Sequence, residues 1–317
     1  MTLAPENSAT PDIVGTSRLT VVIPHLNGFD ALARCLGSLD ADRHRFGKPI
    51  SVIVVDNGST RLPAAECARY PFVRLVEERE PGPGPARSHG ARLADTPLLA
   101  FIDADCIAQP GWLSAILAHF DAHPDTAVIG GDVRIARVDP ARPTSIEAYE
   151  SAYGYRMKLY VERDHYTATC NMAVRREAFL KVGDFAGIQL AEDLDWGRRA
   201  TAMGYRIDYV PEMLIETPAR ATFAELARKW DRHIGHDFSE VRSGKDHLRW
   251  IARALAVAAS PLAETARIMR SDRLGGPNER WLALTCVTRI RLYRCRKMLA
   301  LLAGFGRSSA AAWRNEG

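Results

Sequence analysis

The chain has 317 residues, 47% of them hydrophobic and 25% charged, which is typical of a soluble globular protein and excludes a disordered or fibrous chain. The formal net charge is +4, but residues 226–317 hold 18 Lys and Arg against 8 Asp and Glu, whereas the remainder holds 24 against 30. This asymmetry indicates an acidic part, followed by a basic region that meets an anionic surface.

Short apolar segments alternate with helical patterns through the first half of the chain. Strands are predicted over 18–24, 50–55, 72–76, 98–102 and 126–135, and helices over 30–39, 86–94 and 111–123. This alternation predicts an α/β fold with a mostly parallel sheet flanked by helices. In such sheets, ligands bind beyond the carboxyl ends of the strands.

The second half is predicted to be largely helical. Tyr149, Tyr153 and Tyr160 recur at helical spacing, which favours a core stripe. Helices are predicted over 171–181, 194–203 and 281–302, and a late strand over 206–210 that ends at a proline. We therefore expect an N-terminal tail over 1–17, a catalytic domain over 18–225 and a basic C-terminal helical region over 226–317.

Cysteine spacing and the N-terminal sequence predict where the protein acts. The six cysteines form no CxxC pair and no zinc-site spacing, so we expect reduced thiols. Residues 1–17 lack the apolar core of a signal peptide, and no apolar run approaches the roughly 20 residues of a membrane span. We expect a cytoplasmic protein, with a peripheral place at the inner face of the cell membrane left open.

Two aspartates one residue apart follow the predicted strand over 98–102. Side chains two residues apart in a strand point the same way, so Asp103 and Asp105 can face one point. Their repulsion favours a cation between them, and Mg²⁺ or Mn²⁺ takes oxygen ligands and bridges phosphates. The alternative is an Asx-type turn. Asn27 and Asp56 lie past two further strand ends, which favours a binding site.

Several ordered motifs together resemble family 2 of the glycosyltransferases, whose members have the GT-A fold. The resemblance covers about 19–232 and rests on VVIPHLN at 21–27, VVDNGS at 54–59, DAD at 103–105, NMAVRR at 171–176 and EDLD at 192–195. It implies an inverting hexosyltransferase that moves a sugar from a nucleotide-diphosphate donor, with a UDP-sugar favoured, to a hydroxyl acceptor in the synthesis of a cell-surface polysaccharide or glycolipid.

The resemblance also implies a donor site. Pro24 and Asn27 belong to the first strand end, and Asp56 accepts a ring N–H of the base, or alternatively only caps its turn. Arg87 and Asp103 approach the diphosphate. The alternative for Arg87 is a solvated helix charge. Asp105 binds the metal together with Asp103.

The acceptor side follows from the later motifs. Asp193 is implied as the catalytic base that deprotonates the acceptor hydroxyl, while Glu192 orients the loop. An acidic first helical turn, favoured by the helix dipole, is compatible with this role. Asn171 precedes the acceptor site, and Trp196 stacks on a sugar or packs in the core.

Two features of the later sequence bear on the donor. Many relatives place a further histidine ligand after the late strand, where this chain has Glu216 or Thr217, so strict metal dependence is an open question. Trp230 and Arg232, in the basic segment after the catalytic domain, are candidates for a lid over the diphosphate.

The helix over 281–302 mixes apolar side chains with five cations, which is typical of a helix in a membrane interface. The same pattern fits a helix packed on the domain or at a homodimer contact. No nucleic-acid partner is expected. Two other functions are compatible with the sequence, namely a nucleotidyltransferase and a non-catalytic glycan- or lipid-binding scaffold. The sequence names neither the sugar, the acceptor, the linkage nor the oligomeric state.

Overall fold

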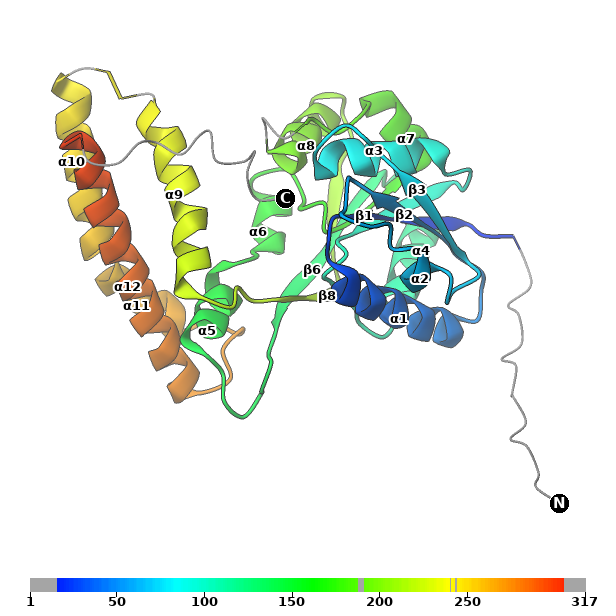
Figure 1. Ribbon diagram of the computed structural model, residues 1–317, viewed down its shortest axis with the longest axis horizontal. Coiled ribbons are helices and arrows are strands. Elements are labelled where there is room, and N and C mark those ends of the chain that lie inside the picture. Colours follow the sequence, from blue (N-terminus) through cyan, green and yellow to red (C-terminus); the bar gives the residue numbers. More distant parts are fainter. Residues whose placement is uncertain (1–15, 188–190, 240, 243, 305–317) are drawn as a thin grey trace. The chain divides into compact units, whose positions relative to one another are not determined.

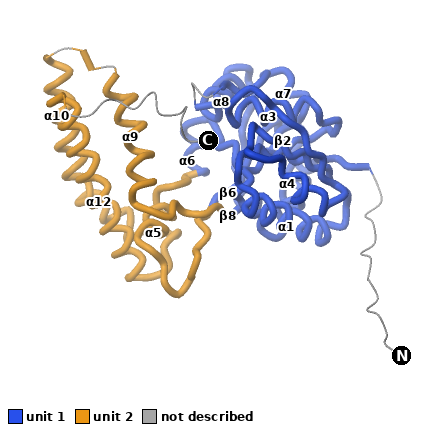
Figure 2. Tube along the Cα trace, viewed as in Figure 1, with its two compact units in different colours: residues 1–133, 157–216 blue, residues 134–156, 217–317 orange. Residues whose placement is uncertain are grey.

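The computed structural model describes residues 16–187, 191–239, 241–242 and 244–304. The predicted N-terminal tail therefore lies almost wholly outside the described residues. The chain divides into two compact units, shown in Figure 2. Unit 1 consists of residues 1–133 and 157–216, and unit 2 consists of residues 134–156 and 217–317.

Unit 1 is built on a mixed sheet. Within the described residues the sheet has eight strands in the order β3-β2-β1-β4-β7-β6-β8-β5. The bounds are β1 Leu19–His25, β2 Ser51–Asp56, β3 Val73–Glu77, β4 Leu98–Ile102, β5 Ile107–Ala108, β6 Val128–Ala136, β7 Asn171–Arg175 and β8 Ile207–Pro218. Strands β3, β2, β1 and β4 pair in parallel, whereas the pairs β4–β7, β7–β6 and β8–β5 are antiparallel.

The predicted α/β fold with flanking helices is confirmed, and its parallel part comprises the strands foreseen before residue 103. In the antiparallel part, β6 and the start of β8 coincide with predicted strands, whereas β5 and β7 were not predicted. The helix predicted over 171–181 is wrong in its first half, because Asn171–Arg175 is the buried strand β7 and α7 begins only at Arg176. The late strand is also longer than predicted, since β8 continues through Pro211 to Pro218.

Helices cover both faces of the sheet, as Figure 1 shows. They are α1 Phe29–Phe46, α2 Ala64–Cys67, α3 Pro83–Leu93, α4 Trp112–Ala122, α6 Met157–Glu162, α7 Arg176–Val182 and α8 Glu192–Ala202. The face under α3, α7 and α8 is an apolar core in which Val22, Phe101 and Trp196 take part. Alternate strand residues supply it, as expected for side chains that point to one face of a sheet.

Gly90 permits α3 to lie close to the sheet. A Cβ at this position would lie 2.5 Å from Val22 Cγ1 and 3.0 Å from Val55 Cγ2. We expect Gly90→Ala to lower the free energy of unfolding by about 1–3 kcal/mol, because an extra methyl in a packed core forces its neighbours apart. Urea denaturation measures this loss.

Gly37→Ala is the matched control for Gly90→Ala. Gly37 also lies within a helix, but its Cβ would meet only Tyr70 Oη, at an ordinary 3.5 Å. Alanine is the better helix former, so this variant is expected to gain about 0.5–1 kcal/mol. Equal stability of the two variants would contradict the close packing of α3.

Unit 2 is a helical bundle organised around α12. Its helices are α5 Ser145–Tyr153, α9 Phe223–Ser239, α10 Gly244–Ala259, α11 Pro261–Met269 and α12 Pro277–Leu302. Side chains of α12 that include Val287 and Ile290 pack with Tyr149 of α5 and Leu226 of α9 in one apolar cluster. A second cluster joins α12 to Trp250 of α10. Hydrophobic burial of this kind stabilises helices that would be marginal alone.

The predicted tyrosine stripe is divided between the units. Tyr149 and Tyr153 stack at a ring separation of 5.2 Å on α5 of unit 2. Tyr160 lies on α6 in unit 1 and stacks on Tyr166 at 5.0 Å.

Among the described helices, none is long and apolar enough to cross a membrane.

Candidate active site

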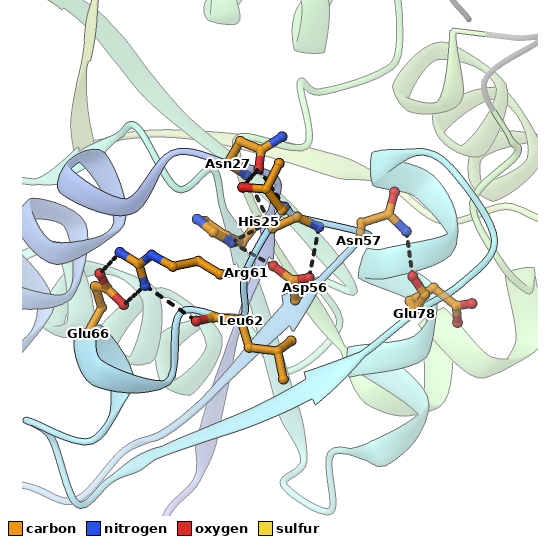
Figure 3. A network of polar contacts seen from close by, with 10 residues as sticks. His25, Asn27, Asp56, Asn57, Arg61, Leu62, Glu66 and Glu78 are labelled. Carbon is orange, nitrogen blue, oxygen red and sulfur yellow. Dashed lines mark hydrogen bonds and ion pairs between the residues drawn. The ribbon is translucent and has the colours of Figure 1, made fainter. Parts of the chain in front are cut away.

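Asp56 is held in a polar network at the carboxyl ends of β1 and β2, shown in Figure 3. His25 Nδ1 lies 2.9 Å from Asp56 Oδ1, and the backbone N–H of Ser59 donates to Asp56 Oδ2 over 3.0 Å. Burial alone would raise the pKa of Asp56, but the hydrogen bonds from Ser59 and His25 outweigh it and lower the pKa. Asp56 is therefore an ionised, well-ordered acceptor at a strand end.

Asn27 and Asn57 fix the loops around Asp56. Asn27 has a positive φ of 55°, which asparagine tolerates better than most residues, and its Oδ1 accepts a hydrogen bond from the N–H of Thr60 over 2.8 Å. Asn57 Nδ2 donates to the carbonyl oxygens of Glu78 and Glu80, and Asn57 Oδ1 accepts from the N–H of Gly82. One asparagine thus joins the loop after β2 to the segment between β3 and α3.

Pro24 has a backbone role beside this network. It lies in β1 opposite Val55 of β2, one position before the His25–Asp56 pair. Asn57 belongs to the VVDNGS motif at 54–59 but was not among the predicted site residues. Its bridging role was not visible, because the carbonyl groups that it binds belong to a loop more than 20 residues away.

Arg87 connects two acidic motifs that are distant in the sequence. It projects from α3 and is only 3% exposed. Its Nη1 donates to Glu192 Oε1 over 3.0 Å, and its Nη2 donates to Asp103 Oδ1. Burial opposes the charge of Arg87, but the two carboxylates outweigh burial and raise the pKa of the guanidinium. Arg87 is thus a buried structural cation rather than the solvated helix charge of the alternative interpretation.

Among the residues that the structure describes, no Lys or Arg forms an ion pair with Asp105. Partial desolvation, together with the negative charge of Asp103, raises the pKa of Asp105. The thiol of Cys106 lies 3.5 Å from Asp105 Oδ1 and is a weak donor. A cation beside Asp105 would therefore stabilise its ionised form, whereas the charge of Asp103 is already balanced by Arg87.

Asp193 opens α8, next to the Glu192 that Arg87 holds. Partial desolvation and the charge of Glu192 raise the pKa of Asp193, against the opposing effects of the Leu194 N–H and of Arg87. The Leu194 N–H donates to Asp193 Oδ1 over 2.8 Å. A carboxylate with raised proton affinity at a helix start is suited to accept a proton from a hydroxyl.

Asn171 and Trp196 lie in the core beneath these groups. Asn171 is fully buried, donates to the carbonyl oxygens of Asp132 and Met213, and accepts from Trp112 Nε1. Trp196 is fully buried too, stacks on Phe179 and donates to the carbonyl oxygen of Gly183. These contacts favour the packing interpretation of Trp196 over stacking on a sugar.

Glu216 and Thr217 occupy the position where the family resemblance implies a histidine ligand. Glu216 lies on β8 opposite Ile107, which follows the Asp105–Cys106 turn, and Thr217 is buried. Across the described parts of the chain, no three His, Cys, Asp or Glu side chains gather into a group that could hold a metal ion. A metal at Asp105 would need oxygen atoms from a ligand or from water to complete its shell.

Trp230 and Arg232 lie on α9 in unit 2. The guanidinium of Arg294 lies 3.7 Å from the Trp230 ring centroid, and Trp230 packs against both apolar clusters of the bundle. Arg232 is exposed. On the same helix, desolvation and then the positive charge of Arg220 lower the pKa of Lys229.

Comparison with known proteins decides the family. The family described as "Glycosyl transferase family 2" matches residues 20–183, more than half of the chain. The chain belongs to glycosyl transferase family 2. The match contains the Asp56 network, Arg87 and the Asp103–Asp105 element, but it ends before Asp193.

Curated relatives of this family 2 glycosyltransferase carry transferase names. Glycosyltransferase AglE of Haloferax volcanii is 29% identical over 218 residues, which is 67% of this chain and 70% of that protein. Pre-mycofactocin glycosyltransferase of Mycobacterium tuberculosis is 28% identical over 265 residues, which is 77% of this chain but only 54% of that protein.

A solved structure identifies the fold of the family 2 chain as GT-A. The mannosyltransferase PcManGT from Pyrobaculum calidifontis, solved in complex with GDP-Man and Mn²⁺, superposes with a TM-score of 0.54 at 19% identity. The alignment covers 98% of this chain and 91% of that one. The predicted GT-A fold with a C-terminal helical region is thereby confirmed.

Proposed function

We propose that this glycosyltransferase moves a sugar from a nucleotide-diphosphate donor to an acceptor hydroxyl with inversion at the anomeric carbon. The observation that carries the proposal is the position of Arg87. Its guanidinium binds both Asp103 after β4 and Glu192 at the start of α8. It thereby brings the Asp103–Asp105 element and the Glu192–Asp193 motif to the same end of the sheet.

Asp193 is the proposed general base. It takes the proton of the acceptor hydroxyl while the acceptor oxygen bonds to the anomeric carbon and the bond from that carbon to the diphosphate oxygen breaks. One displacement from the face opposite the leaving group inverts the centre. Arg87 fixes Glu192, and through the helix start it positions Asp193. The pKa of Asp193, raised above that of an ordinary Asp, favours this proton transfer.

The donor side rests on Asp56 and Asp105. Each carboxylate oxygen of Asp56 keeps a second lone pair beside its hydrogen bond to His25 or Ser59, so Asp56 can accept a ring N–H of a uracil. This geometry supports a donor whose base carries a ring N–H, and a UDP-sugar is the proposed donor of this kind. Trp230 and Arg232 stay predictions as donor contacts, since they rest on the family resemblance.

The residues present fit a divalent metal such as Mg²⁺ or Mn²⁺. Asp105 offers hard oxygen ligands, and its raised pKa marks a carboxylate that a cation would stabilise. The metal, when bound, offsets the negative charge that develops on the departing diphosphate. Asp103 keeps its ion pair with Arg87 and orients the turn that presents Asp105.

The acceptor is proposed to be a glycan or a lipid-linked intermediate of cell-surface glycan synthesis. A panel of nucleotide sugars, assayed for release of nucleoside diphosphate with and without Mn²⁺, tests the proposal. Release from at least one donor, with UDP-sugars preferred, is the expected result. Release of pyrophosphate from a nucleoside triphosphate would instead support a nucleotidyltransferase, and the absence of any turnover would support a non-catalytic scaffold.

Asp105→Asn tests the metal site separately. We expect nucleotide-sugar binding in Mn²⁺ to weaken roughly tenfold or more, since even outer contacts of metal sites have effects of that size. Without metal, the variant and the wild type should bind alike. Isothermal titration calorimetry with and without chelator measures both affinities. Wild-type binding that is unchanged by chelator would rule out the metal at Asp105.

A further inference from the structure

Unit 2 carries a long exposed apolar stripe that the proposed reaction does not use. It runs along α10 and α11, which Ser260 joins in helical backbone geometry. Its members recur every three or four residues, and they are Leu248, Ile251, Leu255, Ala259, Leu262, Ala266 and Met269. This spacing places them on one helix face. Leu248, Leu255 and Leu262 are 70%, 57% and 85% exposed, so this face is open.

Other residues anchor these helices in the bundle. Trp250, Ala254, Pro261 and Ile268 are buried, and they lie on the opposite side of the helical repeat from the stripe. Trp250 Nε1 also donates to the carbonyl oxygen of Met298 on α12 over 2.9 Å. The stripe is therefore not needed to hold α10 and α11 in unit 2. A contiguous exposed apolar face of this length indicates an interaction site.

Cations border the stripe. Five exposed Lys and Arg side chains lie along these helices and the residue after them, and they are Lys245, Arg249, Arg253, Arg267 and Arg270. Arg249, Arg253 and Arg267 pair with Asp246, Asp237 and Glu264, in that order. Because Glu264 also accepts from Tyr153 and Arg291, the five cations still outnumber the acidic side chains with which they pair. The face thus combines apolar side chains with a positive border.

We propose that the α10–α11 stripe docks on an anionic lipid membrane surface. The leucines enter the boundary between head groups and acyl chains, and the bordering cations contact anionic head groups. Charge decides against a second copy of the chain as the occupant. A two-fold contact would set this positive border against its own copy, and like charges at an interface are unfavourable.

α12 is less suited to this role, although its sequence suggested it. Most of its cations contact groups of the bundle, because Arg291 pairs with Glu264, Lys297 pairs with Asp231, and Arg294 lies over Trp230. Arg289 lies over Phe223 although it is exposed, and Arg296 is exposed. At its first turn, Trp281 is 65% exposed. The neighbouring Arg280 donates to the carbonyl oxygen of Met269, so the start of α12 lies near the end of α11. Exposed tryptophan is favoured at membrane interfaces.

Vesicle flotation of the full chain tests the surface. We expect binding to vesicles of phosphatidylcholine with one quarter phosphatidylglycerol to exceed binding to pure phosphatidylcholine by about tenfold or more, and to weaken with added salt. Leu255→Glu with Leu262→Glu should lose this binding, and Arg249→Glu with Arg270→Glu should weaken it on anionic vesicles only.

Leu180→Glu with Met203→Glu is the matched control for the apolar changes. These unit 1 side chains are 47% and 53% exposed, so the control adds the same charge elsewhere and should bind vesicles like the wild type. Transfer to a water-soluble acceptor should be unchanged in all these variants. The proposal would be overturned if the wild type bound neither the anionic nor the pure phosphatidylcholine vesicles, or if the stripe variants bound vesicles like the control. A dimer that only the stripe variants dissociate, without vesicle binding, would assign the face to a second copy.

Discussion

Asp193→Asn is expected to abolish sugar transfer while leaving donor binding intact. The amide keeps the size of the side chain but cannot take the proton of the acceptor hydroxyl, and loss of a general base reduces rates by up to about 10⁴-fold. We expect a fall in kcat of at least about a thousandfold. The nucleotide-sugar affinity should stay near that of the wild type. Initial rates and calorimetry on the same samples measure the two quantities.

The pH dependence gives an independent measure of Asp193. Its pKa is raised, and the base works only when deprotonated, so activity should fall as pH drops through a value above the usual Asp range. Because the folded state binds this proton more tightly than the unfolded state, the ionised group destabilises the fold at neutral pH. Asp193→Asn should therefore melt at the same temperature as the wild type or higher.

Asp195→Asn is the matched control for Asp193→Asn. Asp195 lies two residues further along α8, and its carboxylate pairs with Arg199 over 2.9 Å, away from the proposed chemistry. We expect it to keep transfer close to that of the wild type. Transfer by Asp193→Asn within tenfold of the wild type, or an equal loss in both variants, would refute the assignment of the base.

Arg87→Met is expected to damage both activity and stability. The variant leaves Asp103 and Glu192 facing each other without their shared cation. Breaking a buried ion pair on one side costs about 3–5 kcal/mol, and we expect about 3, because both carboxylates keep some contact with solvent. Transfer should fall at least about a hundredfold, since the turn of Asp105 and the start of α8 lose their common anchor.

Arg92→Met separates this effect from the loss of any arginine on α3. Arg92 lies on the same helix and pairs with Asp184 at the surface, where an ion pair contributes little. It should unfold within about 1 kcal/mol of the wild type and keep full transfer. The triple change of Arg87→Met with Asp103→Asn and Glu192→Gln should recover stability but not activity. If Arg87→Met alone retained full transfer, the bridge would have no role in positioning.

Strand ends rich in polar residues predicted much of the candidate site. Asp56 ends the apolar strand β2 and Asp103 follows the apolar strand β4, so the parallel part of the sheet brings both to one edge. Asp193 lies in the acidic first turn of α8. The role of Asn171 was harder to foresee. Its side chain satisfies two carbonyl groups of β6 and β8, and strands that pair over such sequence distances leave no local pattern.

The double ion pair of Arg87 could not be predicted either. A sequence shows that an arginine follows a Gly/Pro-rich loop, but its partners lie 16 and 105 residues away. The surroundings of the α12 cations were equally hard to predict. These cations resemble those of a membrane-facing helix, and only the bundle shows that Arg294 is buried and Lys297 paired. Periodicity identifies faces, whereas partners depend on the tertiary fold.

The division of the chain has a consequence for how such proteins diversify. Unit 2 is assembled from an internal segment, 134–156, and from everything after 216. Tyr149 of α5 packs with Val287 and Ile290 of α12, so the two segments share one apolar cluster. A gene fusion or recombination event near residue 217 would combine the α5 of one protein with the C-terminal segment of another. Exchange of the helical bundle between homologues therefore requires two matched crossovers, and the internal segment and the tail should change together in evolution.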